Sequence, residues 1–153
     1  MLLSKRCEYG LRALMYLAAT SPEGYVSLRD ISEELGLSFP FLGKIFQRLN
    51  DAGLTTSRRG PNGGVSLARD PEAVTLHEVV AALDGEELFT ECVLGLPGCG
   101  AEAPCPLHDA WVRRRDQIEL LFRRATLAET AAETNAQKYR LTALADAAGD
   151  DGA

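Results

Sequence analysis

The 153-residue sequence contains no long hydrophobic run, although 46% of its residues are hydrophobic. A membrane-spanning helix needs roughly 20 consecutive apolar residues, and no segment approaches that length. The sequence also shows no secretory signal peptide, because Lys5, Arg6 and Glu8 precede only a short amphipathic segment. We therefore expect a cytoplasmic protein with about one domain and no membrane partner.

The sequence also lacks the residue sets on which common enzyme sites depend. It has only two histidines, and it shows no Ser/His/Asp set, no phosphate-binding loop and no paired carboxylates that would line a cleft. We therefore predict that the protein is not an enzyme.

Basic residues are in the minority, and the net charge of −6 argues at first against a nucleic-acid partner. The charge is uneven, however. Residues 1–70 carry a net charge of +2, whereas residues 71–153 carry −8. Between residues 38 and 69 there are five basic residues and one acidic residue. A locally basic surface on an acidic body is sufficient for docking on phosphates.

Cysteine is scarce, but three of the four cysteines lie close together. They are Cys92, Cys99 and Cys105, and His108 follows them. The segment 92–108 that holds them is rich in glycine and proline, which break helices and strands. It can therefore fold its sulfurs around one centre. Thiols stay reduced in the cytoplasm, which favours metal or redox chemistry over structural disulfides.

The cysteine spacing favours an iron–sulfur cluster over zinc. A structural zinc site usually shows cysteine pairs two to four residues apart, and this segment has none. Longer and more even spacing suits a cluster, whose ligands must reach around a larger object. Zinc, or thiols without a metal, remain as alternatives. The fourth cysteine, Cys7, is interpreted as a small buried hydrophobic residue.

Helical periodicity and capping residues predict three helices in the first third of the sequence. They cover residues 5–20, 27–35 and about 39–52. The second and third helices are joined by a tight glycine turn and match a helix-turn-helix, whose second helix is the recognition helix. Within it, the residues predicted to contact DNA are the capping Ser38 together with Lys44, Gln47 and Arg48.

A β-hairpin is predicted directly after these helices. Residues 54–58 and 65–68 alternate as strands do, and a glycine-rich turn separates them. Such a hairpin is a wing, with Arg58 and Arg59 at a tip that can enter a minor groove. Asn62, in the same turn, is the remaining residue predicted to contact DNA.

The second half predicts three more helices. One covers residues 74–83 and begins with a capping box of Thr75 and Glu78. The longest runs from 106 to about 125, and the last extends from 126 to about 139 or 144. The apolar stripe of the longest helix suits an antiparallel pair between the subunits of a symmetric dimer.

Two groups of polar residues in these helices are interpreted as surface residues. His77 has no second ligand near it in the sequence and is interpreted as a surface histidine. The arginines of the longest helix are interpreted as a solvated face with local ion pairs. They are Arg113, Arg114, Arg115, Arg123 and Arg124.

Together, these elements predict a mainly α fold with a small β-hairpin wing. Residues 1–84 are expected to form a winged helix-turn-helix DNA-binding domain, and 85–108 a cysteine-rich cluster-binding loop. Residues 106–145 are expected to form the dimerisation helices, and 146–153 a disordered tail.

The sequence resembles the IscR/NsrR group of winged-helix iron–sulfur regulators, the Rrf2 superfamily, from Leu2 to about Thr130. The resemblance is carried by residues 3–14, by 37–45 in the recognition segment, by 52–64 in the wing and by the cysteine loop. It implies a homodimeric transcriptional regulator that binds a double-stranded DNA operator. It also implies a 2Fe–2S or 4Fe–4S cluster that senses nitric oxide, redox state or iron–sulfur supply.

The same resemblance implies the cluster ligands. Cys92, Cys99 and Cys105 occupy the family's cysteine positions. For the fourth ligand, His108 occupies the place of a histidine in IscR-like members, and Glu8 occupies that of an acidic residue supplied by the partner subunit in NsrR-like members. We favour His108, because a nearby ligand loses less chain entropy. The alternatives are a thiol-based or zinc-containing regulator without a cluster, and a redox or cluster-carrier protein.

Overall fold

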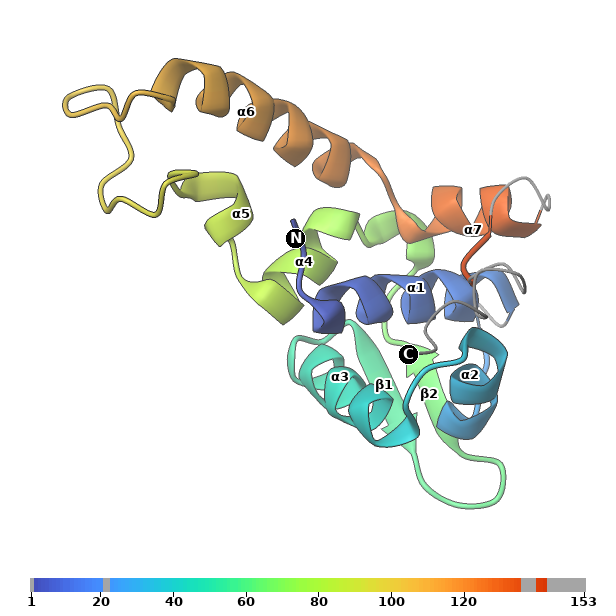
Figure 1. Ribbon diagram of the computed structural model, residues 1–153. Helices are drawn as coiled ribbons and strands as arrows, with labels where there is room; N and C mark the ends of the chain where they lie inside the picture. Colours follow the sequence, from blue (N-terminus) through green and yellow to red (C-terminus); the bar gives the residue numbers. More distant parts are fainter. Residues whose placement is uncertain (1, 21–22, 136–139, 143–153) are drawn as a thin grey trace, which may run out of the picture.

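The computed structural model of the chain describes residues 2–20, 23–135 and 140–142. The elements are α1 (Lys5–Thr20), α2 (Leu28–Leu35), α3 (Phe39–Asp51), β1 (Thr55–Arg58), β2 (Gly64–Leu67), η1 (Pro71–Ala73), α4 (Leu76–Asp84), α5 (Glu87–Thr90), α6 (His108–Arg124) and α7 (Leu127–Asn135). Figure 1 shows α1–α4, the hairpin and α7 packed together, with the cysteine loop and the start of α6 extending to one side. None of the helices in these ranges is long and apolar enough to cross a membrane.

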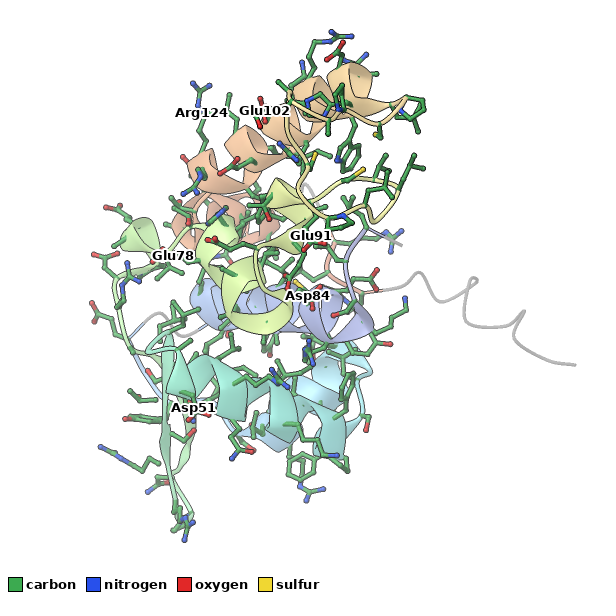
Figure 2. All side chains as sticks on the ribbon, turned by 90° about the vertical axis from the view of Figure 1, so that its left-hand side faces the viewer. Asp51, Glu78, Asp84, Glu91, Glu102 and Arg124 are labelled. Atoms are coloured by element: carbon green, nitrogen blue, oxygen red, sulfur yellow. The ribbon has the colours of Figure 1, made fainter. Side chains whose placement is uncertain are left out.

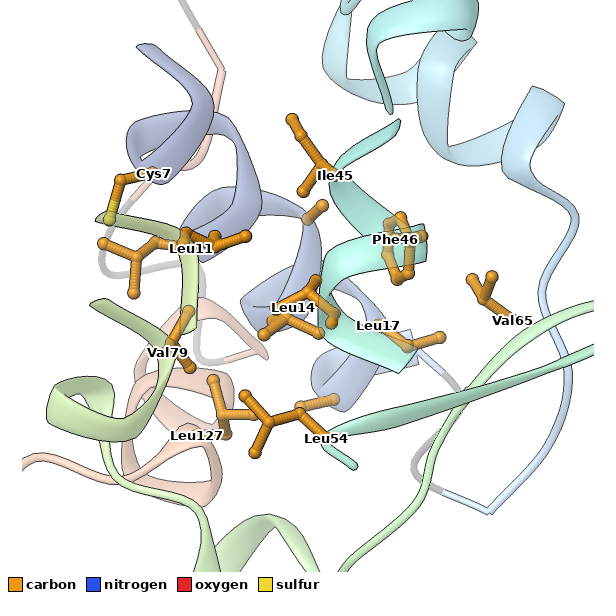
Figure 3. Close-up of a cluster of buried hydrophobic side chains, with 14 of the residues drawn as sticks. Cys7, Leu11, Leu14, Leu17, Ile45, Phe46, Leu54, Val65, Val79 and Leu127 are labelled. Atoms are coloured by element: carbon orange, nitrogen blue, oxygen red, sulfur yellow. The ribbon is translucent and has the colours of Figure 1, made fainter. Parts of the chain in front are cut away.

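α1 lies at the centre of the packed part, against α2, α3, α4 and α7. Leu14 and Leu17 of α1 are completely buried and share one apolar cluster with Phe46 of α3 and Leu127 of α7 (Figure 3). Burial of apolar surface contributes about 25 cal/mol per Å², so this cluster is the main stabilising feature of the winged-helix part. Cys7 is also completely buried in it, which confirms the prediction for that cysteine.

The helix-turn-helix forms as the capping residues predict. The Ser27 hydroxyl accepts a hydrogen bond from the Arg29 amide, and the Ser38 hydroxyl accepts one from the Phe41 amide. Gly36 ends α2 with a φ of 64°, a left-handed conformation that glycine adopts without strain. The chain can therefore turn directly from α2 into α3 within three residues.

The hairpin is fastened to the segment before α2. β1 and β2 pair in antiparallel register, with Thr55 opposite Leu67. Val26 and Val65 then exchange two backbone hydrogen bonds of 2.9 and 2.8 Å. Gly64 permits this close approach, because it has a φ of 145° and a Cβ there would overlap the Val26 carbonyl group. The wing thus has a fixed position relative to the helix-turn-helix.

The second half differs from the prediction in two places. The short helix α5 was not expected; Gly85 ends α4, and Phe89 of α5 turns back into the core. Within the described residues α7 covers Leu127–Asn135, and residues 140–142 are irregular, so a helix that continues to residue 144 is wrong. Residues 136–139 and the predicted tail 146–153 lie outside the described residues.

Candidate functional site

The cysteine loop brings its predicted ligands together in two pairs. The Sγ atoms of Cys92 and Cys105 are 3.5 Å apart, and the Sγ atom of Cys99 is 3.7 Å from Nδ1 of His108. All four side chains line the same small pocket, together with Leu96, Pro97, Gly98 and Ala103. The three cysteines are free thiols. The loop therefore has three soft sulfur donors and one imidazole facing a common space.

The local backbone favours the thiolate form at one end of this pocket. The Leu94 amide donates to Sγ of Cys92 at 3.4 Å. Backbone amides of Leu94 and Leu96 lower the pKa of the Cys92 thiol, whereas burial raises that of Cys105. The thiolate is the form of cysteine that binds metals, and amide hydrogen bonds to sulfur are a feature of iron–sulfur sites.

This donor set fits an iron–sulfur cluster in its chemistry, since thiolate and imidazole are both known cluster ligands. The two pairs do not converge on a single ion. In residues 2–20, 23–135 and 140–142 no group of three or more His, Cys, Asp or Glu side chains is arranged around one metal position.

The start of α6 is clamped onto the loop by two side chains. Nε1 of Trp111 donates to the Glu91 carbonyl at 2.8 Å. Nη1 of Arg115 donates to the Thr90 carbonyl at 2.9 Å and lies 3.6 Å from Sγ of Cys99. Arg115 is therefore partly buried and bonded to the end of α5, so its interpretation as part of a solvated face with local ion pairs is wrong. The carbonyls at the end of α5 attract its guanidinium, a tertiary contact that the sequence spacing does not reveal.

Glu8, the alternative fourth ligand, is not brought to the cysteines of its own chain. Its carboxylate pairs with Lys5 at 2.8 Å. The start of α1 is held against α4, because the amide of Ser4 donates to the Asp84 carboxylate at 2.9 Å. The cysteine loop extends away from this end of α1 in Figures 1 and 2. A role for Glu8 in the cluster of a partner subunit stays a prediction.

The residues predicted to contact DNA are all exposed, on α3 and on the wing. They are Ser38, Lys44, Gln47, Arg48, Arg58, Arg59 and Asn62. The Asn50 side chain bonds to the hydroxyls of Ser57 at 2.6 Å and Thr55 at 2.5 Å, which ties α3 to β1. A turn from Gly60 to Gly63 places Asn62 at the tip of the wing.

Two aromatic contacts hold arginines at this surface. The Arg58 guanidinium lies over the Tyr25 ring at 4.6 Å, and that of Arg29 lies over the Phe39 ring at 5.0 Å. Both arginines line one cleft between α2, α3 and the wing. Arg29 is not among the residues predicted to contact DNA; its position in the first turn of α2, the helix before the recognition helix, is a signal in the sequence that places a basic residue near this surface. In Figure 2 the wing lies at the opposite end of the molecule from the cysteine loop.

His77 is not a surface residue, contrary to its sequence interpretation. It is 5% exposed, its ring stacks on Phe89, and its Nε2 lies 4.0 Å from a carboxylate oxygen of Glu119 in α6. The periodicity of α4 alone does not show that α5 and α6 cover this face of the helix.

A protein-family model described as Rrf2, iron-dependent transcriptional regulator, matches residues 3–133. The chain belongs to the Rrf2 family. The transcriptional regulator IscR of Yersinia enterocolitica is 36% identical over 129 residues, which cover 84% of this chain and 78% of that relative. Among solved structures, CymR, the global cysteine regulator of B. subtilis, has a TM-score of 0.73 at 29% identity and covers 85% of this chain and 95% of its own. T. potens IscR has a TM-score of 0.70 at 28% identity, covering 90% and 91%.

Membership of the Rrf2 family confirms the resemblance read from the sequence and the mainly helical fold with a wing. Rrf2 proteins are transcriptional regulators, so the winged helix-turn-helix of this chain is a DNA-binding element.

Proposed function

We propose that this Rrf2 regulator is a homodimer that binds a double-stranded DNA operator and responds to the state of an iron–sulfur cluster. Cys92, Cys99 and Cys105 would hold the cluster, with His108 as the favoured fourth ligand. The observation that carries the proposal is the shared pocket of three free thiols and one imidazole. The signal would be nitric oxide, redox state or iron–sulfur supply, sensed in the cytoplasm.

The cluster, when bound, supplies a centre whose oxidation or loss depends on the chemistry of the cell. The chain holds the four ligand side chains in place and connects the loop that carries them to the DNA-binding part. Trp111 and Arg115 fix the loop to α6, and α6 packs on α4 of the winged helix. A change in the loop can therefore shift the population of winged-helix positions in a dimer.

The surface that would meet DNA is the exposed side of α3 and the wing. Lys44, Arg48 and Arg59 are exposed there. Arginine and lysine attract phosphates, and a wing arginine can enter a minor groove, where negative potential is focused. The acidic second half of the chain would lie away from the duplex, because the wing and the cysteine loop are at opposite ends (Figure 2).

α6 supports the dimer in this proposal. None of its residues is buried, and Leu120 and Leu121 are 47% and 63% exposed. Together with Ala125 they line a shallow groove. Exposed apolar patches of this kind mark interaction sites, and a second α6 in antiparallel arrangement would cover this one with the same residues.

A thiol-based regulator without a cluster is the second candidate. The 3.5 Å separation of the Cys92 and Cys105 sulfurs favours it, because a disulfide needs only a further approach to about 2.05 Å. Loss of two electrons and two protons to an oxidant such as a peroxide would join these sulfurs in place of a cluster.

The proposal is tested by DNA selection. Duplexes that bind the anaerobically purified protein are enriched from a random pool, and their affinities are measured for cluster-loaded and cluster-free protein. We expect a two-fold symmetric site whose affinity differs between the two forms and falls steeply with salt, because phosphate contacts release counterions. No preferred sequence in either form would contradict the proposal.

A further inference from the structure

Arg115 lies on the face of α6 that meets the cysteine loop. It follows His108 by seven residues, and Trp111 lies between them. An α-helix makes a turn about every 3.6 residues, so these three side chains share one face. His108 reaches Cys99, and Trp111 reaches the Glu91 carbonyl. Arg115 is the third contact on this face, two turns into the helix.

One nitrogen of Arg115 meets both the beginning and the middle of the cysteine loop. Nη1 contacts the Thr90 carbonyl at 2.9 Å and the Glu91 carbonyl at 3.3 Å, directly before Cys92. The same atom is 3.6 Å from Sγ of Cys99. The two carbonyls end α5, where the chain has no further helical amides to donate to them. Two segments of the loop are therefore joined through one guanidinium.

The positive charge of the Arg115 guanidinium complements the negative charge expected at Cys99. An arginine is always protonated, and a thiolate or an iron–sulfur cluster at Cys99 carries negative charge. The Nε atom of Arg115 is buried and has no hydrogen-bond partner among the described residues. A buried donor without a partner is unusual in a folded protein. The guanidinium thus retains one N–H group for a further acceptor.

We propose that Arg115 is a positioning residue of the cysteine loop. It holds the entry of the loop and Cys99 against α6 before any cluster is present. Its positive charge then raises the reduction potential of a bound cluster, because the reduced form carries one more negative charge. The first half stands on the contacts of the chain alone, and the second half rests on the proposed cluster.

The first test uses the reduced, cluster-free protein. Amide hydrogen exchange is measured over residues 91–107 in the wild type, Arg115→Ala, Arg115→Lys and, as a matched control, Arg114→Ala on the exposed face of the same helix. Arg115→Ala should exchange about tenfold faster in this segment, which corresponds to about 1.4 kcal/mol. Arg115→Lys should restore part of the protection, and the control should match the wild type. If residues 91–107 exchange at the wild-type rate in Arg115→Ala, Arg115 does not hold the cysteine loop in place.

The second test uses the same variants after anaerobic cluster reconstitution. The reduction potential of Arg115→Ala should be lower than that of the wild type, while Arg115→Lys should stay near the wild type. An unchanged potential in Arg115→Ala would overturn the role of the charge. If neither the wild type nor any variant takes up iron and sulfide, the proposed cluster is wrong. The hydrogen-exchange data would then still show whether Arg115 holds the cysteine loop against α6. Thermal unfolding of each variant is measured as well, and a cooperative transition near the wild-type temperature is the check that the variant folds.

Discussion

The imidazole of His77 in α4 stacks on the ring of Phe89 in α5, with ring centroids 4.5 Å apart and an interplanar angle of 28°. Phe89 in turn contacts the ring of Phe122 in α6, at 5.9 Å. Three rings therefore link the winged helix to the helix whose first residue is His108. This aromatic contact is one of the places where α6, the helix that follows the cysteine loop, packs on the DNA-binding part.

Two substitutions of His77 distinguish the contribution of its ring packing to stability from that of its polar nitrogens. His77→Ala should lower the free energy of unfolding by about 2 kcal/mol, because it removes a stacked ring and leaves a cavity. His77→Phe keeps a ring and removes Nε2, which is buried without a hydrogen-bond partner among the described residues, so it should stay close to the wild type. Chemical denaturation checks both. Equal losses in the two variants would show that the imidazole nitrogens matter more than the ring.

The lowered pKa of Glu78 predicts that the stability of the fold depends on pH. Partial burial opposes ionisation, but hydrogen bonds from Arg69 and Thr75 outweigh it and hold the pKa of Glu78 below 4.5. A carboxylate with a lowered pKa stabilises the fold above its unfolded-state pKa, and this contribution is lost as the pH falls through the folded-state value. Glu78→Gln should therefore cost up to about 1 kcal/mol near pH 7, because the amide keeps the capping position but loses the charge that pairs with Arg69.

The difference between wild type and Glu78→Gln should shrink as the pH is lowered below 4.5. Unfolding by denaturant at a series of pH values measures it. A difference that stays constant down to pH 3 would mean that the ionised carboxylate contributes nothing.

Arg59 at the wing tests the predicted DNA surface. Arg59→Ala should weaken binding to a selected operator by about 1–3 kcal/mol if the guanidinium enters a groove, and by less if it contacts only phosphate. Arg113→Ala, which removes the same charge from exposed α6, is the control and should bind almost as the wild type does. Fluorescence anisotropy at physiological salt measures both. Equal affinities for the wild type and Arg59→Ala would remove Arg59 from the groove.

The fourth cluster ligand is predicted to be His108. Its Nδ1 atom is 3.7 Å from Sγ of Cys99 in the same chain, whereas Glu8 pairs with Lys5 and needs a partner subunit to reach a cluster. After anaerobic reconstitution, His108→Ala should change the visible spectrum and shorten the lifetime of the cluster, and Glu8→Ala should change neither. The reverse result would establish a ligand that crosses the dimer.

Local chemistry made most of the fold predictable. Ser38 and the capping box of Thr75 and Glu78 lie within a few residues of the helix ends that they satisfy, so the sequence reveals them directly. The pairing of Cys99 with His108 is also local, within one loop and the first turn of a helix.

Contacts between elements were not predictable in the same way. His77 is buried because α5 and α6 cover it, and Arg115 is partly buried where it meets the carbonyls at the end of α5. Neither cause lies within the helix that carries the residue. Glu8 is a further case, since its proposed role depends on a second copy of the chain.

The content of iron and acid-labile sulfide in anaerobically purified protein shows whether the cysteine loop holds an iron–sulfur cluster. Cys99→Ser and Cys7→Ser are compared with the wild type, because Cys7 is a cysteine buried in the core, outside the loop. We predict coloured wild-type and Cys7→Ser proteins that contain iron and sulfide, and a Cys99→Ser protein that loses both. Stoichiometric zinc without sulfide in the wild type would rule out a cluster, and equal iron and sulfide in Cys99→Ser would rule out Cys99 as a ligand.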